Sequence, residues 1–291
     1  MCSAPDLLIT YNWGATEALM AVLSLRLPAI HTEDGFGVDE KQRLKRRRVL
    51  VRRVLLRRAF AVVVPSNALR QIATTKYRLP ESKVRFIVNG VDLDRFRPEG
   101  SRSLREQLRA PDDMVVFGTV GWLRPEKGLD ALIRLFAQAD IPNTKLVIVG
   151  DGPCRAKLEE LVQHLQLTER VCFVGATDDP APYLHALDVF VMSSRTEQTP
   201  ISLLEAMACG LPAICTDVGD SALLLGTNQH PMVVPPDQPM PYIKALKELA
   251  ASAELRKQSG EENRLRCEQN YSYSRMLESY RELYSDALRT S

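Results

Sequence analysis

The sequence predicts an α/β protein with two doubly wound lobes, each a parallel sheet covered by helices. Short apolar runs alternate with helical segments along almost all of the 291 residues. These apolar runs are continuous rather than alternating, which is typical of parallel strands buried on both faces. A polar stretch at residues 97–113, with Pro98, Gly100 and Pro111, interrupts the order and indicates a connection between the lobes that holds a short helix.

The first lobe is expected over residues 1–98, and it is short. Its strands are predicted at residues 6–10, 28–31, 61–64 and 84–88. Its helices are predicted at residues 17–25, 41–59 and 68–77, the last of them starting after Ser66-Asn67. A doubly wound lobe usually has five or six strands, so one or two strand–helix units are expected to be missing from the front. Either the lobe is abbreviated, or the sequence begins inside a longer protein.

The second lobe is expected over residues 112–272. Its strands are predicted at residues 115–120, 145–149, 171–174, 189–192, 212–216 and 232–234. Its helices are predicted at residues 128–139, 154–165 and 202–208, with two or three more between residues 240 and 288. The terminal helix, at residues 273–291, is predicted to cross back to the first lobe.

Composition excludes several classes of protein. Hydrophobic residues make up 45% of the chain and charged residues 25%, which argues against a disordered chain or a fibrous repeat. The longest apolar stretch, residues 18–25, is too short to span a bilayer, and no secretory signal is recognised at the start. The six cysteines form no Cys-x-x-Cys pair. They are expected to be the reduced thiols of a cytoplasmic protein, without a disulfide frame or a zinc site.

One segment is strongly basic. Residues 41–58 hold ten lysines and arginines and no acidic residue, although the net charge of the chain is only +2. On a helix, one apolar stripe would be formed by Leu44, Val51, Val54 and Leu55, with most of the charges opposite. Two interpretations remain open: a helix packed on the first lobe with its arginines in solvent, or a helix that contacts an anionic membrane, peripherally at its inner face. Nucleic-acid binding is not expected, because no aromatic interleaving or binding motif accompanies the charge.

The most informative segment is residues 193–212. It joins a buried strand to a helix through a polar loop, with Glu197 in the loop and Glu205 about one turn into the helix. Open α/β sheets bind ligands at the carboxyl ends of their strands, and a helix N-terminus offers N–H groups to an anion. Carboxylates repel phosphate, so their expected partners are ribose or sugar hydroxyls. For the two glutamates taken alone, the other interpretation is that Glu197 caps the helix and Glu205 lies on a solvated face.

Three further segments complete a pattern. The loop after the first strand of the second lobe reads Val120-Gly121-Trp122-Leu123-Arg124-Pro125-Glu126-Lys127-Gly128. A glycine turn reads Val149-Gly150-Asp151-Gly152-Pro153, and the first lobe ends with Asn89-Gly90-Val91-Asp92, followed by Phe96 and Pro98. With Glu197 and Glu205, these segments resemble, in order and spacing, the retaining family 4 glycosyltransferases, which have an E-x7-E signature and the two-lobed GT-B fold. The resemblance covers nearly the whole chain.

The resemblance implies a role for each matching residue. Glu205 would hold the ribose hydroxyls of a nucleotide, and Glu197 would hold hydroxyls of the transferred sugar. Lys127 would neutralise the diphosphate leaving group, whose charge grows as the glycosidic bond breaks. His31 would be the histidine of the first lobe that faces the donor sugar. A lone histidine after a short strand can equally well be structural.

The other implied donor contacts lie along three segments. They are expected from Gly121, from Val174 and Gly175 against the base, and from a helix start formed by Thr199, Pro200, Ile201 and Ser202. The sequence departs from the family at Trp122, where the family commonly has an arginine that pairs with phosphate. Either Arg124 reaches the same anion or Trp122 stacks on the ligand; the alternative is a loop that binds no phosphate.

The predicted function is transfer of a sugar from a nucleoside diphosphate-sugar to a hydroxyl of a sugar, lipid-linked or polysaccharide acceptor, with retention of configuration. No cofactor or divalent metal is expected, because no Asp-x-Asp stands where it would be needed, and Asp178-Asp179 is expected to cap a helix. The alternative is a truncated, non-catalytic nucleotide-sugar-binding protein or partner subunit. A dinucleotide-dependent oxidoreductase is disfavoured, because the turn at residues 150–152 lacks the third glycine of that fingerprint.

Overall fold

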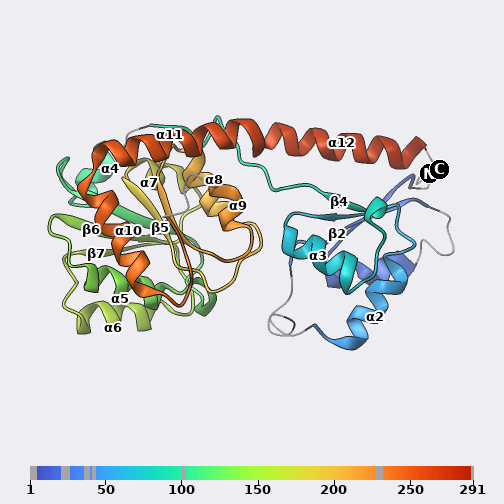
Figure 1. Cartoon of the computed structure of the whole chain (residues 1–291), viewed down its shortest axis with the longest axis horizontal. Coiled ribbons are helices and arrows are strands. Elements are labelled where there is room, and N and C mark those ends of the chain that lie inside the picture. Colours follow the sequence, from blue (N-terminus) through green and yellow to red (C-terminus); the bar gives the residue numbers. More distant parts are fainter. Residues whose placement is uncertain are drawn as a thin grey trace. The chain divides into compact units, whose positions relative to one another are not determined.

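The computed structural model describes residues 5–20, 27–35, 40, 44–99, 102–226 and 232–289. Contacts divide the chain into two compact units, residues 1–89 with 274–291 and residues 90–273. Each unit is built of helices around a parallel sheet (Figure 1). The predicted α/β fold class is therefore confirmed.

The first unit contains a four-stranded parallel sheet in the order β1-β2-β3-β4. Its strands are β1 (Leu8–Tyr11), β2 (Ala29–Thr32), β3 (Ala61–Val64) and β4 (Val84–Phe86). Its helical segments are η1 (Trp13–Ala18), α2 (Arg46–Leu55), α3 (Asn67–Thr75) and η3 (Glu81–Lys83). α3 begins after Ser66 because the Ser66 hydroxyl accepts a hydrogen bond from the Leu69 amide at 3.2 Å. The helix expected at residues 17–25 lies mostly outside the described residues, and its first residues belong to η1.

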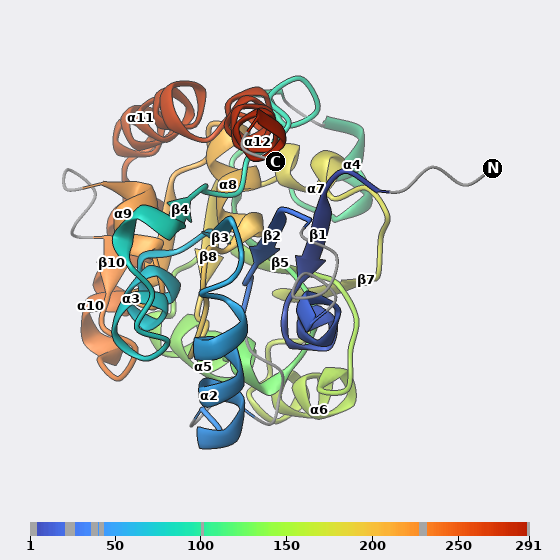
Figure 2. The ribbon, with the colours of Figure 1, turned by 90° about the vertical axis from the view of Figure 1, so that its right-hand side faces the viewer.

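Helices cover both faces of this sheet. Ala29, Val62 and Val64 pack with the buried side chains of α2 and α3 on one face. On the other face, Ile30 and Val63 pack against Leu283 and Ala287 of α12 (Tyr273–Arg289). Figure 2 shows α12 on one side of these strands and α2 and α3 on the other. The terminal helix is thus a structural part of the first unit.

The second unit contains a six-stranded parallel sheet in the order β10-β9-β8-β5-β6-β7. Its strands are β5 (Val115–Val120), β6 (Thr144–Val149), β7 (Val171–Gly175), β8 (Val189–Met192), β9 (Ala213–Thr216) and β10 (Val233–Val234). The chain adds β6 and β7 on one side of β5 and then crosses to β8 on the other. The strand order therefore reverses between β5 and β8, and such a switch point is where open α/β sheets bind ligands.

The helices of the second unit form two layers around this sheet. They are α4 (Arg102–Gln107), η4 (Pro125–Lys127), α5 (Leu129–Ala139), α6 (Arg155–His164), α7 (Ala181–His185), α8 (Ile201–Ala208), α9 (Ser221–Leu225), α10 (Pro239–Ala251) and α11 (Ala253–Asn270). α5 and α6 lie on one side of the sheet and α8 and α11 on the other (Figure 1). The rings of Phe117 in β5 and Phe136 in α5 meet edge to face, with centroids 6.2 Å apart.

The described part of the polar stretch at residues 97–113 contains the expected short helix, α4, and is grouped with the second unit. Arg105 pairs with Asp188 at 3.0 Å and donates to the Met114 carbonyl at 2.7 Å. The Lys145 ammonium donates to the carbonyls of Leu108 and Arg109 at 2.6 and 3.2 Å. The Arg105–Asp188 pair and the bonds from Lys145 therefore fix α4 and the residues after it to the second unit, and the first unit already ends at Asn89.

The arrangement of α2 also differs from expectation. Arg52, expected on the charged side, is 1% exposed, whereas Val54, expected in the buried stripe, is 56% exposed. Arg52 donates from Nε to Glu33 at 2.8 Å and from a terminal nitrogen to Glu40 at 3.1 Å. Two acidic partners on the first unit thus draw this arginine inward, and Val54 turns to the surface as a result. The expectation that the arginines of this helix all lie in solvent is wrong for Arg52.

Two findings bear on the class of protein. Within the part of the chain that the structure describes, no helix is long and apolar enough to cross a membrane. The five cysteines in that part are free thiols rather than disulfides. Burial raises the pKa of Cys209 and of Cys267 to about 12, so both thiols stay protonated near neutral pH.

Candidate functional site

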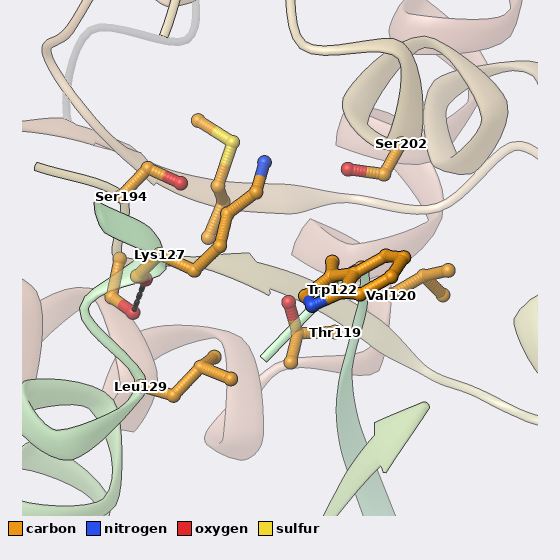
Figure 3. Close-up of a pocket in the computed structure, with 10 residues that line it drawn as sticks. Thr119, Val120, Trp122, Lys127, Leu129, Ser194 and Ser202 are labelled. Carbon is orange, nitrogen blue, oxygen red and sulfur yellow. Dashed lines mark hydrogen bonds between the residues drawn. The ribbon is translucent and has the colours of Figure 1, made fainter. Parts of the chain in front are cut away.

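A pocket lies at the switch point of the second sheet, at the carboxyl ends of β5 and β8. It is lined by Gly121, Trp122 and Lys127 after β5, by Ser193 and Ser194 after β8, and by Ser202 of α8. The extended side chain of Lys127 reaches into the space between Ser194 and Ser202 (Figure 3). Two of the segments singled out in the sequence, the loop at 120–128 and the segment at 193–212, therefore meet at one site.

Two predicted site residues, Lys127 and Glu197, form an ion pair beside this pocket. The Lys127 ammonium lies 2.6 Å from Oε1 of Glu197, and the Ser194 hydroxyl donates to the same oxygen at 2.7 Å. The two charged side chains are 29% and 13% exposed. A cation and a carboxylate that are 70 positions apart in sequence are therefore paired, and each can be reached from solvent.

The loops that carry Lys127 and Glu197 are held together by a second set of contacts. The Ser193 hydroxyl donates to the carbonyls of Lys127 and Gly128, both at 3.0 Å. Arg195 binds both carboxylate oxygens of Asp130 at 2.8 and 2.7 Å and donates to the Pro125 carbonyl. The Arg195 amide also donates to the Glu126 carbonyl at 2.7 Å. These bonds fix the backbone on either side of the ion pair.

Sequence reasoning did not find this second set of contacts. Ser193 and Arg195 lie inside the segment that it singled out, but nothing in the sequence links them to residues 125–130. Gly128 is the one visible sign, because it adopts a φ of +62° and a Cβ there would collide with the Ser193 carbonyl. Glycine is therefore required at residue 128, because the loop after β8 approaches it closely.

Trp122, where the sequence departs from the family pattern, lies at the pocket beside Arg124. The indole is 59% exposed and lines the pocket. The Arg124 guanidinium lies over this ring, 4.8 Å from its centroid. A Cβ at Gly152 would come within 2.7 Å of the indole nitrogen, and one at Gly150 would collide with the Gly121 carbonyl. The glycine turn thus lets the loop carrying Trp122 and Arg124 pack closely on β6.

Four residues at the start of α8 were expected to contact the donor, and one of them, Ser202, lines the pocket. α8 begins at Ile201 with Pro200 as its N-cap. Ser202 lines the pocket, whereas the Ile201 side chain is 52% exposed and Thr199 is buried. The positive end of the α8 dipole is therefore at the same site as the Lys127 ammonium.

Glu205 lies further along α8 and is not among the residues that line this pocket. It is three residues after Ser202, which places both on one face of the helix. Burial raises the pKa of Glu205 to about 7, and the nearby Arg95 acts in the opposite direction. Arg95 itself donates to Asp179 at 2.9 Å, and this bond lowers the pKa of Asp179.

The residues expected to contact a base stand at the end of another strand. Val174 and Gly175 end β7, and the Gly175 carbonyl accepts a hydrogen bond from the Gly150 amide at 2.8 Å. Neither lines the Lys127 pocket. The Asp179 carboxylate accepts from the Ala181 amide at 3.3 Å, but the N-cap of α7 is Pro180, and the bond of Asp179 to Arg95 was not foreseen. Among the described residues no group of three His, Cys, Asp or Glu side chains could hold a metal ion.

His31 is in the interior of the first unit. It is 0% exposed, its Nδ1 lies 2.7 Å from the Thr10 hydroxyl, and its Nε2 lies 3.2 Å from Glu33. Both ring nitrogens therefore have partners within the first unit. His31 is fully buried, and the structural interpretation of this histidine accounts for the partners of both ring nitrogens.

These features define a class of protein: two α/β units with a switch-point pocket in the second are the architecture of GT-B glycosyltransferases. Residues 101–266 match the family model described as glycosyl transferases group 1, and residues 3–95 match the one described as glycosyltransferase family 4. The chain therefore belongs to the family 4 glycosyltransferases, as the resemblance of its motifs to that family indicated.

Individual proteins agree with this assignment. Sucrose-phosphate synthase from Thermosynechococcus elongatus superimposes with a TM-score of 0.85 and 26% identity, over 98% of this chain and 74% of that one. Anabaena Alr3699/HepE in complex with UDP gives a TM-score of 0.86 at 21% identity, over 96% and 79%, which shows the fold alone. An uncharacterized glycosyltransferase of Methanocaldococcus jannaschii is 28% identical over 226 residues, or 73% of this chain and 56% of the relative. The chain spans about half the length of the curated relatives it matches.

Proposed function

We propose that this glycosyltransferase moves a sugar from a nucleoside diphosphate-sugar to an acceptor hydroxyl, with retention of anomeric configuration. The observation that carries the proposal is the Lys127–Glu197 pair, 2.6 Å apart beside the switch-point pocket. A bound diphosphate attracts the ammonium, which frees the carboxylate to accept hydrogen bonds from sugar hydroxyls. The ion pair thus supplies Lys127 for the diphosphate of the donor and Glu197 for its sugar.

The proposed donor contacts extend along α8. Lys127 and the α8 N-terminus stabilise the diphosphate, whose charge increases as the glycosidic bond breaks. Glu205 accepts hydrogen bonds from ribose hydroxyls, while Val174 and Gly175 lie against the base. Support for a uridine nucleotide comes from the Anabaena protein of the same fold, which is described in complex with UDP.

A second cation is proposed at the phosphates. Glu197 cancels the charge of Lys127, so the pair by itself contributes no net positive charge for a diphosphate. Arg124 supplies that charge, and Trp122 holds its guanidinium at the pocket by stacking. In this proposal Trp122 is a positioning residue, and Arg124 replaces the arginine that the family commonly has at residue 122.

The proposed chemical step is front-face attack. The acceptor oxygen bonds to the anomeric carbon on the face from which the diphosphate departs, and the carbon–oxygen bond to the phosphate breaks. The acceptor proton passes to an oxygen of the departing diphosphate, so that the products are the glycosylated acceptor and a nucleoside diphosphate. The acceptor is proposed to be a sugar, a lipid-linked glycan or a polysaccharide.

The experiment that tests this proposal is titration calorimetry with UDP, GDP and ADP, followed by NMR of the sugar that is released or transferred. We expect one nucleotide to bind and the first product to keep the donor's anomeric configuration. The Lys127→Ala variant should lose most of the affinity, whereas Lys157→Ala, an exposed lysine of α6, should not. Absence of binding by all three nucleotides, or inversion in the first product, contradicts the proposal.

The metal-free reaction and the compartment are proposals as well. Turnover should be unchanged after chelation with EDTA, and a loss that Mg²⁺ or Mn²⁺ restores contradicts this. A cytoplasmic location is supported by the free thiols of the described residues, and fractionation of expressing cells tests it.

The second candidate function is a nucleotide-sugar-binding protein without turnover. The complete burial of His31 favours it, because that residue was expected to face the donor sugar. Affinity and donor hydrolysis measured on one sample separate the two functions. Nucleotide affinity without any hydrolysis or transfer supports the binding protein.

A further inference from the structure

The exposed face of α2 combines aliphatic and basic side chains. Leu50 and Val54 are 57% and 56% exposed and lie one helical turn apart, so their side chains are neighbours on the surface. Arg46 and Arg47 precede them and are exposed, and Arg57 and Arg58 follow in the turn after the helix. We refer to these six residues as the α2 face.

The α2 face has no acidic counterpart in the chain around it. No Asp or Glu occurs between residues 41 and 80, so the next segment adds only basic charge. Arg53 donates to the Lys76 carbonyl at 2.9 Å and Arg57 to the Arg78 carbonyl at 3.2 Å. These bonds hold the exposed Lys76 and Arg78 beside α2, and an open groove lined by Leu50, Arg53 and Lys76 runs between them.

The structural function of the helix does not account for this face. The packing side of α2 already contains Leu55 in the core and Arg52, which is paired with Glu33 and Glu40. Leu50 and Val54 therefore add nothing to the core, and exposing two adjacent aliphatic side chains is unfavourable in water. Arginines around an aliphatic centre fit a surface that is anionic outside and apolar beneath.

We propose that the α2 face binds the surface of an anionic lipid bilayer, with Leu50 and Val54 inserted at the boundary between headgroups and acyl chains and the arginines at the phosphates. The charge complementarity selects this partner over a neutral bilayer. The aliphatic centre selects it over a nucleic acid, because Leu and Val neither stack on bases nor hydrogen-bond to them. The inference concerns the first unit and holds whichever reaction the second unit supports.

The test is co-sedimentation of the full chain with vesicles of phosphatidylcholine, alone or with 30% phosphatidylglycerol. We expect binding only to the anionic vesicles, and release when salt is raised from 50 to 500 mM. Leu50→Gln with Val54→Gln, which leaves the charge unchanged, should lower the partition coefficient about tenfold. Its matched control is Leu265→Gln in α11, a leucine that is 52% exposed on the second unit.

A series of charge variants separates the electrostatic contribution of the arginines from the apolar contribution of Leu50 and Val54. Arg46→Gln and Arg47→Gln should each lower the partition coefficient about fivefold, and Lys257→Gln in α11 should leave it unchanged. The variants must show the parent's circular dichroism and melting temperature, since Arg48 and Arg52 are kept. A single-stranded oligonucleotide serves as the competing polyanion.

Three outcomes overturn the proposal. The first is no sedimentation with anionic vesicles at 50 mM salt. The second is wild-type partitioning of the Leu50→Gln, Val54→Gln variant, which leaves only non-specific charge attraction. The third is tighter binding of the oligonucleotide than of the vesicles, which assigns the face to nucleic acid.

Discussion

The two units contain ion pairs of the same chemistry in opposite surroundings. In the second unit, Lys127 and Glu197 are 29% and 13% exposed beside the switch-point pocket. In the first unit, Arg52 and Glu33 are each 1% exposed, and Glu33 also contacts His31. Solvent therefore reaches the first of these pairs, whereas the second is enclosed in the structure of its unit.

Burial, and not residue type, therefore distinguishes the two ion pairs. An ion pair that solvent reaches contributes about 0–1 kcal/mol to stability at the surface, and the part-buried Lys127–Glu197 pair is expected near the upper end of that range. Removing one partner of a buried pair leaves an uncompensated charge and costs about 3–5 kcal/mol. His31 belongs to the buried network, and its sequence neighbourhood alone gave no indication of that.

The largest expected effect is the loss of the buried pair. Arg52→Ala removes the buried guanidinium that Glu33 and Glu40 share, leaving Glu33 with His31 and Glu40 with Arg48, and should destabilise the first unit by about 3–5 kcal/mol. Urea unfolding followed by fluorescence and circular dichroism measures this, with the transition of the second unit as an internal reference. Arg58→Ala, on the exposed side of the same segment, should change stability by less than about 0.5 kcal/mol. A loss below about 1 kcal/mol for Arg52→Ala contradicts the comparison.

Glu205 is an intermediate case, a mostly buried carboxyl whose pKa is raised to about 7. Its folded pKa exceeds its ordinary value of 4.5, so the folded chain keeps a proton that the unfolded chain has lost. The associated stability is fully present below about pH 4.5 and is lost as the pH rises to about 7, by up to about 3 kcal/mol. Glu205→Gln should remove this dependence and be more stable than the parent at pH 8. Equal stability of the two proteins at pH 5 and pH 8 shows that burial does not act on this group.

The Lys127–Glu197 pair should affect binding rather than stability. Lys127→Ala is expected to lower nucleoside diphosphate affinity by about 10- to 100-fold, because a charge-assisted hydrogen bond is lost. Its free energy of unfolding should change by less than about 1 kcal/mol. Titration calorimetry and urea unfolding of the same preparations check both values. Unchanged affinity together with a large loss of stability would make this pair structural, like that of Arg52.

The smallest expected effect concerns the stacked pair Trp122–Arg124. Trp122→Ala should lower nucleoside diphosphate affinity about fivefold, because stacking of this kind contributes about 0.5–1 kcal/mol when exposed, and Arg124→Ala should lower it at least as much, because the guanidinium itself is lost. If Trp122 acts only by holding Arg124, the double variant should be no weaker than Arg124→Ala. Fully additive losses mean that the indole contacts the ligand itself.

Much of the fold could be predicted from local sequence. Ala61–Val64 and Val189–Met192 are continuous apolar runs, and both are central, fully buried strands. The spacing of Glu197, Glu205 and Lys127 indicated a family, and the family comparisons confirm it. The inward turn of Arg52 could not be predicted in this way. Periodicity ranks residues by their own polarity and takes no account of acidic partners 12 and 19 positions away.

The sequence by itself determined the α/β class, the strands and the glycosyltransferase family, because apolar runs and the order and spacing of motifs can be read along the chain without knowing its fold. The tertiary structure alone decided which charges pair. Arg195 reaches Asp130 across 65 positions, and Lys127 reaches Glu197 across 70. A hydrogen bond depends on distance in space, and distance in space is set only when the strands of the sheet have taken their order.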